Sequence, residues 1–108
     1  MNSLPAAKPT LAPAKRIVVS QGISQGMLLQ RVSPSYPAVA RQARITGDVL
    51  MQAVIGKDGS IQHLKVLHGQ PLLAQSAITA VKQWRYRPYL LNGNPVEIET
   101  QITVQFKD

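Results

Sequence analysis

Few side chains in this sequence could carry out catalysis or bind a metal. Its 108 residues include two histidines, five acidic residues and no cysteine. Without cysteine the chain has no disulfide, thiolate zinc site or thiol nucleophile, although this leaves the cellular compartment open. His63 and His68 are five positions apart, which would put them on opposite faces of a strand. We therefore do not expect them to share a metal ion.

The acidic residues form one pair with a spacing that acid and base catalysis could use. Glu97 and Glu99 lie in the same polar row near the C-terminus, and paired carboxylates are the working groups of many hydrolases. Asp58 is explained by the turn that it forms with Gly59. Because no nucleophile stands beside a base, we predict a protein with no enzymatic activity, no metal site and no cofactor.

The segment that contains this carboxylate pair is more informative as a strand. From Val96 to Phe106, apolar and polar residues alternate without interruption, and a period of two turns one row toward a core and the other toward water. Eleven residues at roughly 3.3 Å each span about 36 Å, which is long for a strand. At a sheet edge, its unpaired N–H and C=O groups would be a template for an extended peptide. The pattern favours a binding function.

Two regions differ in composition. Residues 1–16 contain Pro5, Pro9 and Pro13 among small and polar residues, which is typical of an extended linker and not of a core. We therefore expect a linker end at 1–16 and one domain at 17–108. The start of the chain has no apolar segment typical of a signal peptide, and no stretch is long and apolar enough to cross a membrane.

The domain pattern predicts an α+β fold of two layers, with two helices on one face of a small antiparallel sheet of about three strands. Asp58-Gly59 between two apolar runs is a strong hairpin signal, because such turns need positive φ angles. The elements expected, in chain order, are a short strand at 27–29, a short helix that begins at Pro37 and ends at Gly47, strands at 48–55 and 61–67, a helix at 72–84, and the strand at 96–106.

Five motifs in this order resemble those of the C-terminal domain of TonB energy-transducer proteins. They are Pro34-Ser35-Tyr36-Pro37, Gly47-Asp48-Val49, Asp58-Gly59, Trp84-Arg85-Tyr86-Arg87-Pro88, and Asn92-Gly93 followed by a strand that ends at Phe106. The resemblance covers about residues 27 to 107. It implies a periplasmic domain of a protein anchored in the inner membrane, although this chain contains no anchor.

The resemblance also implies partners and a mechanism. TonB proteins work with ExbB and ExbD through the N-terminal anchor, and their C-terminal domain binds the TonB box of an outer-membrane transporter by β-strand addition. Force derived from the proton gradient then drives uptake of siderophores, cobalamin or similar nutrients. The residues that match the box-binding strand are Gln101, Ile102, Thr103, Val104, Gln105, Phe106 and Lys107. Those that match the segments near the transporter plug are Pro34, Ser35, Tyr36, Pro37, Arg85 and Arg87.

Two alternative functions and one further prediction follow from the same residues. The net charge of +7 and the basic residues beside Tyr86 and Tyr89 would suit a nucleic-acid-binding module. That module is expected to show a mid-strand aromatic pair or a glycine-rich clamp loop, and neither is evident, so we predict no nucleic-acid partner. A scaffold domain of the TolA type would share the architecture but bind other partners. A long unprotected strand also predicts that a homodimer can form by strand exchange.

Overall fold

The computed structural model describes residues 16–107. The predicted linker therefore lies outside the described residues, except for Arg16. The elements are β1 (Ile17–Val18), α1 (Gln21–Gln25), β2 (Leu28–Gln30), α2 (Ala38–Gln42), β3 (Gly47–Ile55), β4 (Ile61–His68), α3 (Pro71–Val81), β5 (Arg85–Tyr86), β6 (Tyr89–Leu91), β7 (Asn94–Val96) and β8 (Ile98–Phe106). None of the helices in residues 16–107 has the length and apolar character needed to span a membrane.

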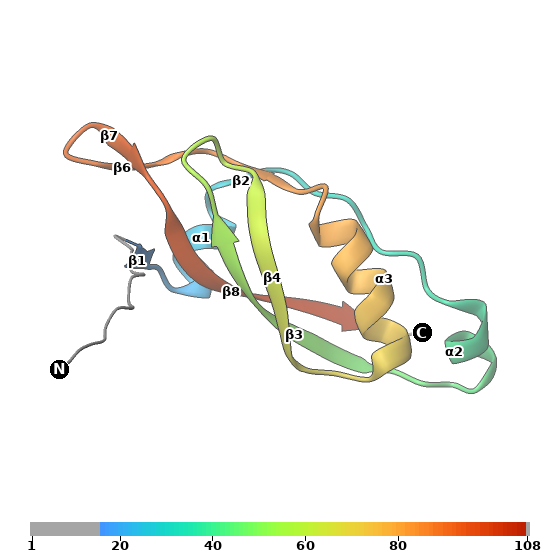
Figure 1. The fold of residues 1–108 in the computed structure, drawn as a ribbon. Helices are drawn as coiled ribbons and strands as arrows, with labels where there is room; N and C mark the ends of the chain where they lie inside the picture. Colours follow the sequence, from blue (N-terminus) through green and yellow to red (C-terminus); the bar gives the residue numbers. More distant parts are fainter. Residues whose placement is uncertain (1–15, 108) are drawn as a thin grey trace, which may run out of the picture.

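The main sheet has four strands in the order β1-β8-β3-β4. Strand β3 is antiparallel to both of its neighbours, and it pairs with β8 over the full length of both strands, from Gly47 opposite Phe106 to Ile55 opposite Ile98. Strand β1 is parallel to the beginning of β8. Figure 1 shows β8 running along the sheet from the β6–β7 hairpin to the C-terminal end of the chain.

The alternation of apolar residues places the core on one face of this sheet, because successive side chains of a strand point to opposite faces. The helices contribute to the same core: α3 packs against β3 and β4, and α1 packs against β8. The buried residues that form this core include Val49, Met51, Ala53 and Ile55 of β3, Ile98, Ile102, Val104 and Phe106 of β8, Ala40 of α2, and Leu73, Ala77 and Val81 of α3. The domain is thus a sheet with helices on one face (Figure 1).

The predicted α+β class is confirmed, and the element counts differ from the prediction in ways that have physical reasons. A third helix, α1, forms in addition to the two expected, and Ser20 caps it by accepting a hydrogen bond from the Ile23 N–H. The main sheet gains a fourth strand because Ile17 and Val18 pair with β8. Two small two-stranded sheets, β2–β5 and β6–β7, lie outside the main sheet.

The expected C-terminal strand is divided at Glu97. Its first residue, Val96, is the last residue of β7, which pairs with β6 across the Asn92-Gly93 turn, whereas β8 pairs with β3 and β1. The alternation continues through the break because both pieces are extended. The helix expected at 72–84 begins at Pro71 and ends at Val81, so Trp84 lies beyond it, although it is buried with 4% exposure.

The hairpin predicted from Asp58-Gly59 joins β3 and β4, although Gly59 alone of the pair has the expected positive φ. Gly59 has a φ of 85°, and the Asp58 carboxylate accepts hydrogen bonds from the Ser60 N–H and hydroxyl at 3.0 and 2.7 Å. These bonds hold the pKa of Asp58 below its usual value. A Cβ on Gly59 would lie 1.8 Å from the Tyr86 carbonyl oxygen. The glycine is therefore needed both for its φ angle and for the close approach of β5.

Candidate functional site

Among the residues that the structure describes, the outer edge of β8 carries backbone groups that have no partner strand. Strand β1 covers only its beginning, where the Val19 N–H donates to the Glu99 carbonyl at 2.8 Å. Glu99 therefore directs its backbone polar groups away from β3. Since these groups alternate along a strand, the same direction applies to Gln101, Thr103 and Gln105, which follow on this edge.

The opposite side of the sheet confirms this alternation. The Gly56 N–H donates to the Ser60 carbonyl, on the β4 side of the hairpin. The backbone N–H and C=O groups of the even residues of β3 therefore point toward β4, and those of the odd residues point toward β8. Met51 pairs with Ile102 and Val49 with Val104. The backbone N–H and C=O groups of the even residues of β8 therefore point toward β3. Since no other described strand pairs with β8 on this edge beyond Glu99, the N–H groups of Gln101, Thr103 and Gln105 have no partner strand within residues 16–107. They form a free edge about 17 Å long, which we define as residues 101–105.

The predicted box-binding strand, Gln101 to Lys107, contains this free edge. The beginning of β8 is not a free edge, because β1 pairs with Ile98 and Glu99. An ion pair supports β1 there: Arg16 lies 3.3 Å from a Glu97 carboxylate oxygen and 3.9 Å from one of Glu99. Glu99 also accepts a hydrogen bond from Gln52 of β3. The carboxylate pair considered for catalysis is thus engaged in structural contacts.

The Tyr-Pro segment lies at the C-terminal end of β8. The ring of Tyr36 meets that of Phe106 edge-to-face, with centroids 5.6 Å apart, and its hydroxyl donates to the Ile45 carbonyl. The Arg41 guanidinium stacks 4.9 Å from the centroid of the Tyr36 ring. Tyr36 therefore packs the α2 region against the sheet while keeping part of its surface exposed.

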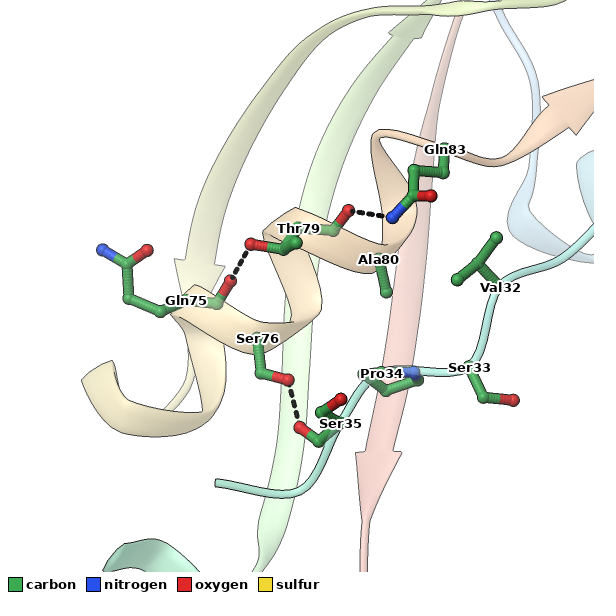
Figure 2. Close-up of a pocket in the computed structure, with 9 residues that line it drawn as sticks. All are labelled: Val32, Ser33, Pro34, Ser35, Gln75, Ser76, Thr79, Ala80 and Gln83. Atoms are coloured by element: carbon green, nitrogen blue, oxygen red, sulfur yellow. Dashed lines mark hydrogen bonds between the residues drawn. The ribbon is translucent and has the colours of Figure 1, made fainter. Parts of the chain in front are cut away.

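The residues before Tyr36 run beside α3 and leave a groove of about 420 Å³ between them and the helix. Figure 2 shows Ser76 of α3 donating its hydroxyl hydrogen to the Ser35 carbonyl, with Pro34 in the same extended segment. Gln75, Thr79 and Gln83 line the helix side of this groove. Thr79 and Gln83 bond the helix carbonyls one turn earlier, and none of the described residues that line the groove is charged.

Arg85 and Arg87 lie at the other end of the sheet. The backbone of Arg85 forms an isolated antiparallel β-bridge with Ser60 of the β3–β4 turn. Arg87 donates a guanidinium N–H to the Gly26 carbonyl at 3.2 Å. The end of β3 next to this turn is about 26 Å from the end next to Tyr36, since eight residue steps separate Gly47 from Ile55. The structure therefore does not bring the two groups of predicted plug-contact residues together.

A groove of about 310 Å³ opens beside the free edge on the core face of the sheet. We call it the edge groove. Trp84 and Tyr86 line it together with Ile102, and the Arg31 guanidinium stacks 5.4 Å from the Trp84 ring centroid. The Trp84 indole N–H donates to the Val32 carbonyl at 2.8 Å, which fixes the ring. Burial raises the pKa of Tyr86 to about 12, so its phenol is neutral at physiological pH.

Sequence reasoning missed the groove residues that come from the N-terminal elements. Gln21, Ser24 and Gln25 of α1 reach the groove, and the Gln21 Oε1 is buried without a hydrogen-bond partner in the described residues. In the sequence, Arg31 is a single basic residue three positions before Pro34, which gives little indication that it belongs to a binding groove. Nothing in its local sequence indicates that it stacks on a tryptophan more than fifty positions away.

The histidines do not form a metal site. A register shift next to Leu50 makes both face the side of the sheet away from the helices, with His68 opposite Leu50 and His63 opposite Val54. The prediction of opposite faces is therefore wrong, but their partners on β3, Leu50 and Val54, are four residue steps apart, which separates the histidines by about 13 Å. In the part of the chain that the structure describes, no three His, Asp or Glu side chains gather into a cluster that could hold a metal ion.

The structure also bears on the nucleic-acid alternative. Tyr86, one of the two tyrosines beside the basic cluster, is only 3% exposed. A buried ring cannot stack on a base, and such stacking is the main sequence-tolerant contact of single-strand binders.

Comparisons with known proteins agree on one family. The family described as Gram-negative bacterial TonB protein C-terminal matches residues 32–107. Protein TonB of Vibrio cholerae is 35% identical over 92% of this chain, and protein TonB of Klebsiella pneumoniae is 36% identical over 79%. The chain spans 45% of the first relative's length and 32% of the second's.

Solved structures give the same answer for the fold. The solution NMR structure of the Pseudomonas aeruginosa TonB C-terminal domain has a TM-score of 0.64 and 28% identity, covering 75% of this chain and 84% of that one. The TonB2 protein of Vibrio anguillarum has a TM-score of 0.58 and 26% identity, covering 98% and 97%. On the extent of the family match and the identity to TonB proteins, the chain belongs to the TonB C-terminal domain family.

Proposed function

We propose that this domain binds the TonB box, a short N-terminal peptide of an outer-membrane transporter, as an added strand on residues 101–105. The observation that carries the proposal is the row of unpaired backbone groups at Gln101, Thr103 and Gln105. An extended peptide beside β8 would satisfy them with main-chain hydrogen bonds, which supply affinity with little demand on side chains.

The family suggests what such binding is for. TonB proteins are energy-transducing transport proteins, and membership of the family separates this chain from the TolA-type alternative. In the whole protein, an N-terminal anchor in the inner membrane would connect the periplasmic domain to ExbB and ExbD. Pulling on the bound strand would then remodel the transporter plug and admit siderophores, cobalamin or similar nutrients.

The plug contacts are proposed at two places. Pro34, Ser35, Tyr36 and Pro37 lie next to the C-terminal end of β8, so a peptide bound to β8 would bring the transporter plug close to them. Arg85 and Arg87 lie at the other end of the sheet, where they would meet acidic residues of the plug or barrel rim. The same free edge would allow two copies of the domain to exchange strands.

Amide hydrogen exchange combined with NMR titration tests the binding proposal. In the free domain, the amides of Ile102 and Val104 should be protected by their bonds to β3, whereas those of Gln101, Thr103 and Gln105 should exchange rapidly. Adding a transporter N-terminal peptide should protect the odd residues alone and leave α3 unshifted. If transporter peptides at millimolar concentration change neither the shifts nor the exchange of these amides, the proposal is wrong.

A further inference from the structure

We propose that the edge groove is a selectivity pocket for one acidic side chain of the added strand, and that Arg31 recognises its carboxylate. The inference rests on the proposed function, because it assigns a side-chain specificity to a peptide bound at the free edge. It concerns residues that take no part in the backbone pairing itself.

Strand geometry determines which peptide side chain can reach the groove. An added strand continues the pleat of the sheet, so its side chains alternate between the two faces. A peptide residue opposite Ile102 would point to the core face, where the edge groove opens between β8 and α1. Its neighbours in the peptide would point to the other face, toward the row that contains Gln101 and Thr103. The groove can therefore contact the side chain of one residue of the added strand, the residue opposite Ile102.

The charges around the groove favour a carboxylate. Arg31 lines it, and no acidic side chain does. Within residues 16–107, Arg16 is the only basic residue that forms ion pairs. In the same part of the chain, the Arg31 guanidinium donates no hydrogen bond. Stacking on Trp84 holds the guanidinium plane while leaving its N–H groups available for the bidentate pairing that arginine makes with carboxylates.

The other lining residues fit the stem of such a side chain. Leu28, which is partly exposed, provides apolar surface beside the guanidinium, above the buried rings of Trp84 and Tyr86. The high pKa of the Tyr86 phenol means that it adds no negative charge near neutral pH. A lysine or arginine in the peptide would instead meet the charge of Arg31 with no acidic group in the groove to compensate.

The experiment uses a host peptide of alternating threonine and valine, acetylated, amidated and ending in lysine on both sides. Each internal position is replaced in turn by glutamate or by glutamine, and dissociation constants are measured from the NMR shifts of β8 amides. At the position that faces the groove, glutamate should bind about fivefold more tightly than glutamine, the scale of a partly exposed ion pair.

Two matched variants test whether Arg31 is the source of the preference for glutamate. Arg31→Gln should abolish the difference between the dissociation constants of the glutamate and glutamine peptides. Arg41→Gln is the control: it also removes one arginine stacked on an aromatic ring, that of Tyr36, and it should keep the fivefold difference. An unchanged amide spectrum outside the groove shows that each variant is folded.

The outcomes separate the pocket from the binding function. If the peptides shift the β8 amides but glutamate shows no advantage at any position, the pocket is wrong and strand addition stands. A preference that survives in Arg31→Gln also overturns the pocket, because another group must then recognise the carboxylate. If neither host nor transporter peptides perturb β8, the proposed function fails and the pocket fails with it.

Discussion

Replacing Thr103 with proline is the most direct test of the free edge. Proline has no N–H and its ring occupies the space in front of the strand, so it both removes a donor and obstructs a neighbouring strand. The Thr103 N–H faces away from β3, so the substitution should leave the β3–β8 ladder intact. Proline in place of Val104, in contrast, removes a ladder bond to β3 and a side chain that is 1% exposed.

The expected magnitudes follow from this difference. Thr103→Pro should lower the free energy of unfolding by less than about 2 kcal/mol, mainly through the fixed φ of proline, whereas Val104→Pro should lower it by more than about 3 kcal/mol. For a bound peptide, losing one hydrogen bond and some close approach costs about 1 to 2 kcal/mol, which weakens binding roughly 5- to 30-fold.

Calorimetric titration with a transporter N-terminal peptide measures the binding change, and urea denaturation measures the stability of each variant. Thr103→Ala is the matched control, because it shortens the same side chain but keeps the N–H, and its affinity should stay within about twofold of the parent. Unchanged affinity in a folded Thr103→Pro domain would refute the edge as the docking site. If Thr103→Pro unfolds the domain as readily as Val104→Pro, the assignment of the free N–H groups is wrong.

Three further predictions concern the groups that position the edge. Gly59→Ala should lower the free energy of unfolding by more than about 2 kcal/mol in urea denaturation, because the new Cβ would clash with the Tyr86 carbonyl 1.8 Å away; a loss below about 0.5 kcal/mol would contradict the turn geometry. Ser24→Ala should cost about 1 to 3 kcal/mol by leaving the Thr100 hydroxyl without its 3.0 Å partner, and adding Thr100→Val should recover part of that loss in a double-mutant cycle. The raised pKa of Tyr86, about 12 against 10.0 in the unfolded chain, predicts that stability is full below pH 10 and falls as the pH rises to 12, and that Tyr86→Phe removes this part of the decline; an unchanged pH profile would count against it.

Local chemistry explains which elements could be predicted from sequence. The β3–β4 hairpin follows from Asp58 and Gly59, whose side-chain hydrogen bonds and positive φ are properties of the turn itself. Helix α3 begins at Pro71 because proline fits the first helical turn. Both rest on residues within a few positions of one another, and both were found close to their expected bounds.

The features that sequence did not predict depend on distant partners. Val18 is 78% exposed, and its two-residue strand contains nothing that identifies β8 as its neighbour. The break at Glu97 is equally hidden, since the alternation of apolar residues records only which face is buried and not which strand lies alongside. The edge groove combines Arg31 with Trp84 and the end of α1, and no local pattern encodes that combination.

The strand that was missed also sets the length of the binding site. Val19, the residue after β1, is buried with 5% exposure in the core cluster, so β1 is attached by packing as well as by its bonds to Glu97 and Glu99. Removing it from the edge would expose that side chain, at a cost of about 1.5 to 3 kcal/mol for a valine. A short peptide cannot easily offset this cost with the one or two extra hydrogen bonds it would gain at about 1 kcal/mol each. In the proposed docking, the added strand would therefore begin after β1 and extend over residues 101–105, which would place one of its side chains opposite Ile102 and beside the groove that contains Arg31.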